Sequence, residues 1–100
     1  MTVLEIAHIT TTPGSGDAFV AAYRQGRHLL TDLAECQSVT MTRGVESPDT
    51  FRLLVVWDSV EAHIEKFRND EARYAEWRGL IGPHFAEPPV VEHYVDVDAG

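Results

Sequence analysis

The sequence predicts an α+β domain in which one antiparallel sheet carries helices on one face, in the ferredoxin-like order β-α-β-β-α-β. Three observations support this prediction: an apolar run at residues 51–57, a long amphipathic pattern at residues 17–35, and a closing run at residues 90–97 that follows two prolines. Both alternate faces of residues 51–57 are apolar, so both sides of the sheet need cover. Because the few helices of one chain cover only one side, we expect a second copy, forming a homodimer, on the other.

Length and charge narrow the possible partners. The 100 residues are expected to form a single domain, 1–100, with a modest core. The net charge of -8 and the pI near 4.9 oppose binding to nucleic acid or an anionic membrane, because both need a basic surface. A small aromatic molecule is the expected partner.

Cysteine content and the N-terminal sequence favour a cytoplasmic protein. Cys36 is the only cysteine, which excludes an intrachain disulfide and suits a reducing compartment. The first residues lack a basic segment followed by an apolar one, and no apolar run approaches the roughly 20 residues that span a bilayer.

The first half of the chain predicts a strand followed by a helix. Residues 3–11 alternate, with Leu4, Ile6 and His8 on one face, which is typical of a strand. Residues 17–35 show helical spacing of apolar and small residues. Gly26 lies on that apolar stripe, where the missing side chain permits close packing.

The second half predicts a hairpin and a second helical region. Residues 38–45 and 51–57 flank a turn-forming segment with Pro and Asp, and Asp58 is the expected N-cap of the helix that follows, with Glu61 three residues later. The sequence Asn-Asp at 69–70 interrupts or recaps this helix, and Gly-Pro at 82–83 ends it. Residues 90–97 then form the closing strand.

The order of these elements, the sequence Trp-Asp-Ser-Val-Glu-Ala at 57–62 and the ending Pro-Pro-Val-Val-Glu-His-Tyr at 88–94 together resemble the antibiotic biosynthesis monooxygenase (ABM) domain family. The resemblance covers nearly the whole chain. It implies a dimeric α+β barrel, in which two subunits join their sheets and keep their helices outside. The family includes cofactor-free oxygenases of phenolic polyketides and quinols, haem-degrading enzymes and small-molecule isomerases.

The chain departs from branches of this family at positions that matter for chemistry. Haem-degrading relatives carry an Asn, a Trp and a His where the spacing places Ala7, Lys66 and Glu76, and none of these three can substitute chemically. In the polyketide-oxygenase branch an Asn corresponds to Leu53 and a helix Tyr to His63. Because of these departures, a non-catalytic module that binds a small molecule or haem is an alternative to an enzyme.

Two histidines are the candidate catalytic residues. A cofactor-free oxygenase needs a base to deprotonate an electron-rich phenol, apolar walls to hold the anion near oxygen, and donors for the developing peroxide. His63 lies in the first helical turns after Trp57, and imidazole titrates near neutral pH. His8 is the second candidate. Each can instead be structural, with His63 on the helix surface and His8 in the core.

Five further residues are candidates for substrate binding. Trp57 at the strand end is an expected pocket wall, and Tyr74 and Trp77 fall three apart on one helical face, where they can stack on a planar substrate. His84 lies in a loop that can close one end of the pocket, and Arg52 can hold a substrate anion. The three aromatic residues can instead belong to the core, His84 can be a surface histidine, and Arg52 can form a salt bridge with an acidic side chain.

We therefore predict a cofactor-independent monooxygenase that uses molecular oxygen to oxidise an aromatic polyol, such as a quinol, anthrone or polyketide-like phenol, to a quinone in a helix-side pocket. This chemistry needs no metal, flavin or haem. An isomerase or cyclase acting in the same pocket is an alternative, as is a metal site built from His8, His63 and His84. His93, in the closing strand, is expected at a dimer contact.

Overall fold

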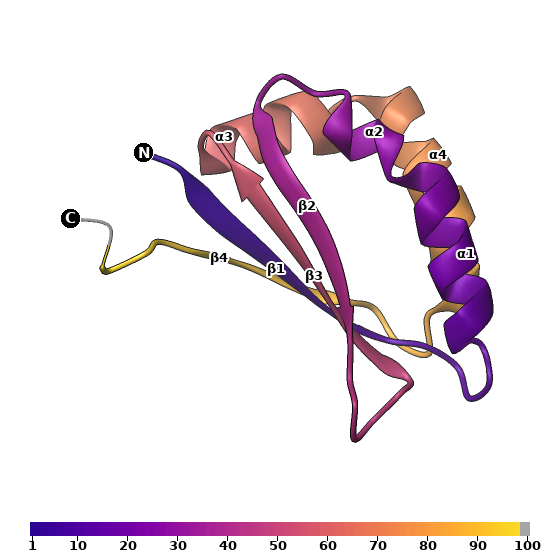
Figure 1. Ribbon diagram of the computed structural model, residues 1–100. Helices are drawn as coiled ribbons and strands as arrows, with labels where there is room; N and C mark the ends of the chain where they lie inside the picture. The colour runs from indigo at the N-terminus through magenta and orange to yellow at the C-terminus, as the bar shows by residue number, and fades with distance from the viewer. Residues whose placement is uncertain (99–100) are drawn as a thin grey trace.

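A computed structural model describes residues 1–98. Its elements, in chain order, are β1 (Val3–Thr10), α1 (Gly16–Gly26), α2 (His28–Thr31), β2 (Cys36–Arg43), β3 (Thr50–Trp57), α3 (Val60–Ala62), η1 (His63–Arg68), α4 (Glu71–Ile81), η2 (Gly82–His84) and β4 (Val90–Tyr94). The four strands form one antiparallel sheet in the order β2-β3-β1-β4, and the helices lie on the same side of it (Figure 1). The predicted α+β class and its element order are confirmed.

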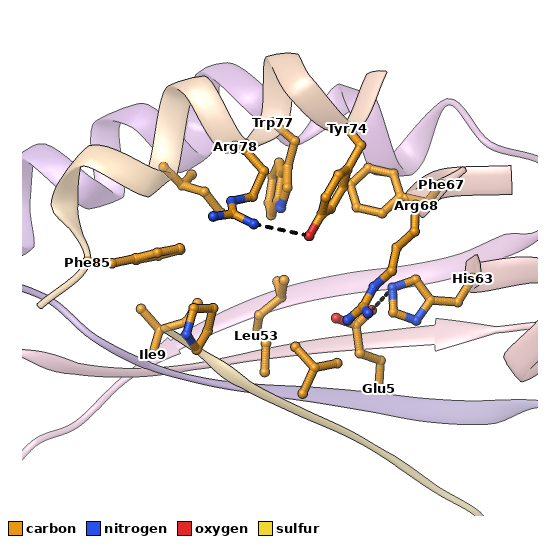
Figure 2. Close-up of a pocket in the computed structure, with 14 residues that line it drawn as sticks. Glu5, Ile9, Leu53, His63, Phe67, Arg68, Tyr74, Trp77, Arg78 and Phe85 are labelled. Atoms are coloured by element: carbon orange, nitrogen blue, oxygen red, sulfur yellow. Dashed lines mark hydrogen bonds and ion pairs between the residues drawn. The ribbon is translucent and has the colours of Figure 1, made fainter. Parts of the chain in front are cut away.

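Strand register decides which side chains face the helices. β1 pairs along its whole length with β3, so that Glu5 lies opposite Val55. On its other side, β1 pairs with β4 over residues 4–8, so that Glu5 also lies opposite His93. The odd-numbered residues of β1 are buried beneath the helices, while the even-numbered ones are only half-buried on the outer face. A cavity lies between the helix-facing side and α4 (Figure 2).

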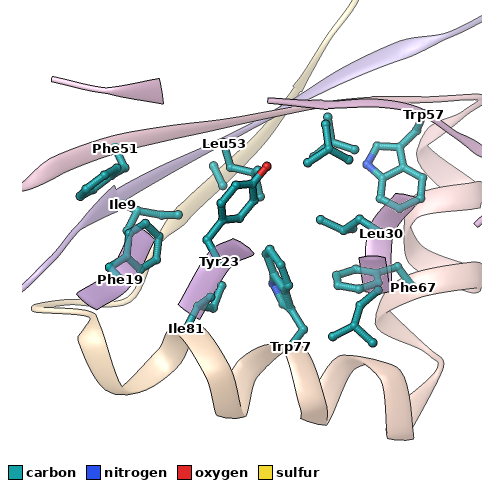
Figure 3. Close-up of a cluster of buried hydrophobic side chains, with 14 of the residues drawn as sticks. Ile9, Phe19, Tyr23, Leu30, Phe51, Leu53, Trp57, Phe67, Trp77 and Ile81 are labelled. Carbon is teal, nitrogen blue, oxygen red and sulfur yellow. The ribbon is translucent and has the colours of Figure 1, made fainter. Parts of the chain in front are cut away.

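The core is aromatic and lies between the sheet and the paired helices α1 and α4 (Figure 3). Phe19 of α1 contacts Phe51 of β3, with ring centroids 4.7 Å apart, and Tyr23 meets Trp77 of α4 edge to face at 6.4 Å. Offset and edge-to-face contacts of this kind add to the free energy gained by burying the rings. The core therefore fixes α4 over the sheet, and α4 forms one wall of the cavity.

The predicted helix at 17–35 is shorter and broken. α1 ends at Gly26, a short α2 follows, and the chain reaches β2 by residue 36. A Cβ added to Gly26 would lie 3.0 Å from Leu80 Cδ1 and 3.3 Å from Trp77 Cε3, so the predicted close packing at this glycine is confirmed. The partner is α4.

The second helical region begins one residue later than predicted. Ser59 is the N-cap, since its Oγ accepts a hydrogen bond from Ala62 N at 3.0 Å, and Asp58 lies before it. The next turns are π-helical, with Asn69 N donating to Ile64 O at 2.8 Å. Asp70 then caps α4 by accepting from the backbone of the first turn, so the predicted recapping is confirmed.

Two more features complete the fold. β4 ends at Tyr94, three residues before the predicted end of the closing strand. Within residues 1–98, every helix is too short or too polar to cross a bilayer.

Candidate functional site

The cavity opens between α4, η1 and the helix-facing side of the sheet (Figure 2). It holds about 430 Å³ of empty space, counted with the solvent at its mouth. Its wall is made by Glu5, Ala7, Ile9, Leu53, His63, Phe67, Arg68, Tyr74, Trp77, Arg78, Ile81, Phe85, Pro89 and Val91. Most of these side chains are apolar or aromatic, and the polar ones gather at two places.

The first polar group is a carboxylate buried in the sheet. Glu5 is 5% exposed, on the same face of β1 as Ala7 and Ile9. Its Oε1 accepts a hydrogen bond from the indole Nε1 of Trp57 at 2.8 Å and lies 3.4 Å from His63 Nε2. A buried carboxylate without such partners would be strongly destabilising, and here two neighbours face the same oxygen.

His63 stands between this carboxylate and the edge of the sheet. It is 1% exposed, and its ring stacks on Trp57 with centroids 5.0 Å apart and planes 13° apart. Its Nδ1 lies 2.8 Å from Nε2 of His93, a hydrogen bond in which either ring can donate. Both ring nitrogens of His63 therefore face protein groups.

Burial shifts the proton affinities of all three groups. Burial raises the pKa of the Glu5 carboxyl, although the Trp57 donor and the nearby Arg68 act in the opposite direction. Burial, together with Arg68 and His93, lowers the pKa of His63 to about 3. Burial and Arg68 also lower the pKa of His93. At neutral pH both imidazoles are therefore uncharged.

The second polar group lies on α4. The Tyr74 ring meets Phe67 edge to face at 5.5 Å, and its hydroxyl lies 3.5 Å from Arg78 Nη1 (Figure 2). The guanidinium of Arg78 also lies over the Tyr74 ring, 5.8 Å from its centroid. Figure 2 shows Arg68 extending from η1 toward Glu5. The cavity thus combines aromatic walls with two cations and one carboxylate.

The structure brings together some of the residues predicted from sequence. His63, Tyr74 and Trp77 all line the cavity. Trp57 is fully buried one layer behind the wall, where it supports His63 and Glu5, so it is not the pocket wall we expected.

Other predicted residues lie elsewhere. His8 and Arg52 lie opposite each other on the outer face of the sheet, away from the cavity, and His8 Nε2 is 3.4 Å from Glu92 Oε1. His84, in η2, packs edge-on against Phe19 at 6.3 Å and is not part of the cavity wall. Among residues 1–98, no three His, Cys, Asp or Glu side chains are grouped to hold a metal ion, and the proposed trio of His8, His63 and His84 does not converge.

Comparison with known proteins identifies the family. The family model described as antibiotic biosynthesis monooxygenase (ABM) matches residues 2–86. This chain belongs to the ABM family. A relative in Bacillus subtilis (strain 168), the uncharacterized protein YczJ, is 30% identical over 95 residues, which cover 95% of this chain and 99% of YczJ.

Solved structures support the fold of this ABM domain. A crystal structure of an ABM homologue from Bordetella bronchiseptica is 38% identical, with a TM-score of 0.91 over 96% of this chain and 97% of that one. SnoaB from Streptomyces nogalater, described as a cofactor-independent oxygenase, has a TM-score of 0.82 at 9% identity, over 98% of this chain and 95% of its own. At that identity the likeness concerns the fold alone.

The sequence reasoning missed four polar residues of this ABM domain: Glu5, Arg68, Arg78 and His93. Glu5 is the one charged residue among the odd-numbered residues 3–9 of the first strand, and this isolated charge is the signal that could have indicated it. His93 was expected at a dimer contact, whereas its register opposite Glu5 turns it toward the helices. Nothing in the local pattern of α4 or η1 singles out the two arginines, because their placement depends on tertiary packing.

Proposed function

We propose that this ABM domain is a cofactor-independent monooxygenase that oxidises an electron-rich aromatic polyol, such as a quinol or anthrone, in the cavity beneath α4. The observation that carries the proposal is a carboxylate and an imidazole, Glu5 and His63, set in the wall of an otherwise aromatic cavity. The fold is also that of SnoaB, described as a cofactor-independent oxygenase.

The substrate is held by its ring. Tyr74 and Trp77 offer aromatic surfaces on the helix side, and Leu53 forms part of the apolar floor. A planar phenol fits between them better than an aliphatic substrate, because stacked rings bury area without a large loss of side-chain entropy. Arg68 and Arg78 supply positive charge to a phenolate.

The reaction follows from these groups. Loss of a phenolic proton to the polar wall gives a phenolate, which transfers an electron to oxygen, and the resulting radical pair forms a carbon–oxygen bond. The peroxide then loses water, so that one oxygen atom becomes the new carbonyl of the quinone and the other leaves as water. The substrate supplies all the electrons, and the fixed guanidinium groups stabilise the negative charge that develops.

We propose further that two copies join by their outer sheet faces. Leu4, Ile6, Leu54 and Val56 lie there only half-buried, and Tyr94 of the neighbouring strand is 42% exposed. Half-buried apolar residues gathered on one sheet face are a surface that a second copy can cover. The joined sheets would form the dimeric α+β barrel.

Oxygen uptake with a panel of quinols and anthrones tests the proposed reaction. We expect consumption of one oxygen molecule per quinone formed, above the rate without protein. Product formation that persists under argon would indicate an isomerase or cyclase. Tight binding of the quinols without turnover would indicate a binding module, and either result would overturn the oxygenase.

A further inference from the structure

Three titratable side chains form a continuous row from the cavity to the sheet edge. Glu5 lies on β1, and His93 lies directly opposite it on the edge strand β4. His63 reaches down from η1 and touches both, at 3.4 Å from Glu5 Oε1 and 2.8 Å from His93 Nε2. Four separate elements hold this row, because Trp57 of β3 donates to the same carboxylate.

Geometry indicates which member of the row meets the substrate. Both ring nitrogens of His63 are directed at Glu5 and His93, which leaves no nitrogen for a ligand. Glu5 lines the cavity, and within residues 1–98 only its Oε1 takes part in a hydrogen bond. The second carboxylate oxygen is therefore the atom best able to accept a proton from a bound phenol.

We infer that Glu5 is the catalytic base of the proposed reaction, and that His63 and His93 form a relay that stores the substrate's proton until it is needed. The inference rests on the proposed function. It assigns the direct role to Glu5, and it makes His63 and His93 positioning residues that act through the carboxylate.

The relay requires a defined arrangement of protons before the substrate binds. At 3.4 Å the contact of His63 Nε2 with Glu5 is longer than a normal hydrogen bond, whereas the contact of its Nδ1 with His93 is short. The relay starts from an ionised Glu5 and from the tautomer in which His63 carries its proton on Nδ1 and donates it to His93 Nε2. The lone pair of His63 Nε2 then faces the carboxylate.

One proton can travel along this row without a net change in atoms. The phenol gives its proton to Glu5, and rotation of the carboxyl group presents that proton to His63 Nε2. The proton on His63 Nδ1 then moves to His93 Nε2, which leaves an anionic Glu5 and a cationic His93. The reverse sequence returns the proton to the peroxide oxygen that departs as water.

The surrounding charges make this storage temporary. Burial is the main cause of the lowered pKa of both imidazoles, the Arg68 cation lowers these pKa values further, and Glu5 is the anion in the row. His93 therefore has a low proton affinity in the protein without ligand. A bound phenolate adds a negative charge beside Arg68, which offsets that cation while the substrate is present. The proton is held when the anion exists and is released as the anion is consumed.

Nitrogen-15 NMR of the histidine rings tests the relay without turnover. A catechol that does not react, added under argon, is the probe. We expect His93 to shift toward the imidazolium form on binding in the wild type, and to remain neutral in Glu5→Gln at equal occupancy. A His93 ring that stays neutral in the catechol-bound wild type, or an identical shift in Glu5→Gln, would overturn the relay.

Kinetics separate the relay from the oxygenase itself. With a quinol that turns over, Glu5→Gln should lower kcat by roughly 10²–10⁴ while the dissociation constant stays within a few fold. Glu65→Gln, an exposed substitution on η1, is the matched control. His93→Asn should change the pH profile of kcat and leave KM nearly unaltered, which a purely structural role would not do.

The two proposals fail in different ways. If Glu5→Gln turns over quinols like the wild type, the oxygenase stands and the relay is wrong. If no quinol reacts but the catechol still protonates His93 through Glu5, the relay stands and the proposed reaction is wrong.

Discussion

The two faces of β1 differ in the burial and the partners of their polar side chains. On the helix side, Glu5 is 5% exposed and meets an indole donor and an imidazole. On the outer side, the His8 side chain is 33% exposed and lies near Glu92 and opposite Arg52, among half-buried apolar neighbours. A carboxylate is buried at a cost in stability, and that cost is usually accepted where the group has a function. The comparison assigns the proposed chemistry to the inner face and the proposed dimer contact to the outer one.

The largest effect is expected from the inner face. His63→Gln should lower turnover by roughly 10²–10⁴, the usual contribution of a positioned acid–base group, because the carboxylate loses its partner in proton transfer. The proposed dimer should form as in the wild type, as measured by light scattering. His28→Gln, on an exposed helix residue, serves as the control and should be fully active. An active His63→Gln would remove this residue from the mechanism.

A substitution on the outer face should weaken the proposed dimer, whereas one on the inner face should lower turnover. Leu54→Asp places a carboxylate in the proposed interface, where burying it without a partner should weaken the dimer by roughly 10²–10³ in dissociation constant. Analytical ultracentrifugation measures this directly. Ala75→Asp, at an exposed position of α4 on the helix side of the sheet, is the control. A wild-type protein that is monomeric at micromolar concentration would break the comparison at once.

The fold was predictable because its signals are local. Apolar alternation at β3, the turn before it and the cap residues near Ser59 and Asp70 all act over a few residues. The break between α1 and α2 was not predictable, since the apolar stripe continues through it. The cap moved from Asp58 to Ser59 because both residue types satisfy the same backbone donors, and tertiary packing selects between them.

The site was predictable only in part. His63, Tyr74 and Trp77 were found because aromatic and titratable residues at helical spacing are visible in a sequence. Glu5 and His93 meet only through strand register, which pairs residues 88 positions apart (93 − 5). A one-residue change in register would turn every side chain of a strand to the other face, so parity alone could not decide which face of β1 holds the cavity.

A smaller effect is expected at the support behind the wall. Trp57→Phe removes the indole donor from Glu5, and losing a hydrogen bond to a buried carboxylate should lower the free energy of unfolding by about 3 kcal/mol at pH 8. The loss should be smaller at pH 4, because a protonated Glu5 depends less on the donor. Urea unfolding at both pH values measures the difference. An equal loss at both pH values would show that packing alone is affected.

The smallest expected effect is the loss of folding stability as the pH falls. The folded pKa of His63, about 3, lies below its unfolded value of 6.5, so the unfolded chain takes up the proton first as the pH falls. Its contribution to stability is complete above pH 6.5 and declines toward pH 3. Between pH 6.5 and pH 5 this amounts to about 2 kcal/mol. Glu5, whose pKa is raised, acts in the opposite direction near its own titration.

Comparing wild type with His63→Gln isolates this contribution. Urea unfolding at pH 6.5 and pH 5, at one protein concentration, should show a steeper loss in the wild type. Parallel losses in the two proteins would contradict a neutral, buried His63.

The most direct test is a crystal structure of the protein with a bound hydroxyquinone. The account predicts a ligand in the cavity beneath α4, with its ring against Tyr74 and Trp77 and a hydroxyl oxygen within hydrogen-bond distance of Glu5. A ligand seated on the outer sheet face, beside His8 and Arg52, would contradict it.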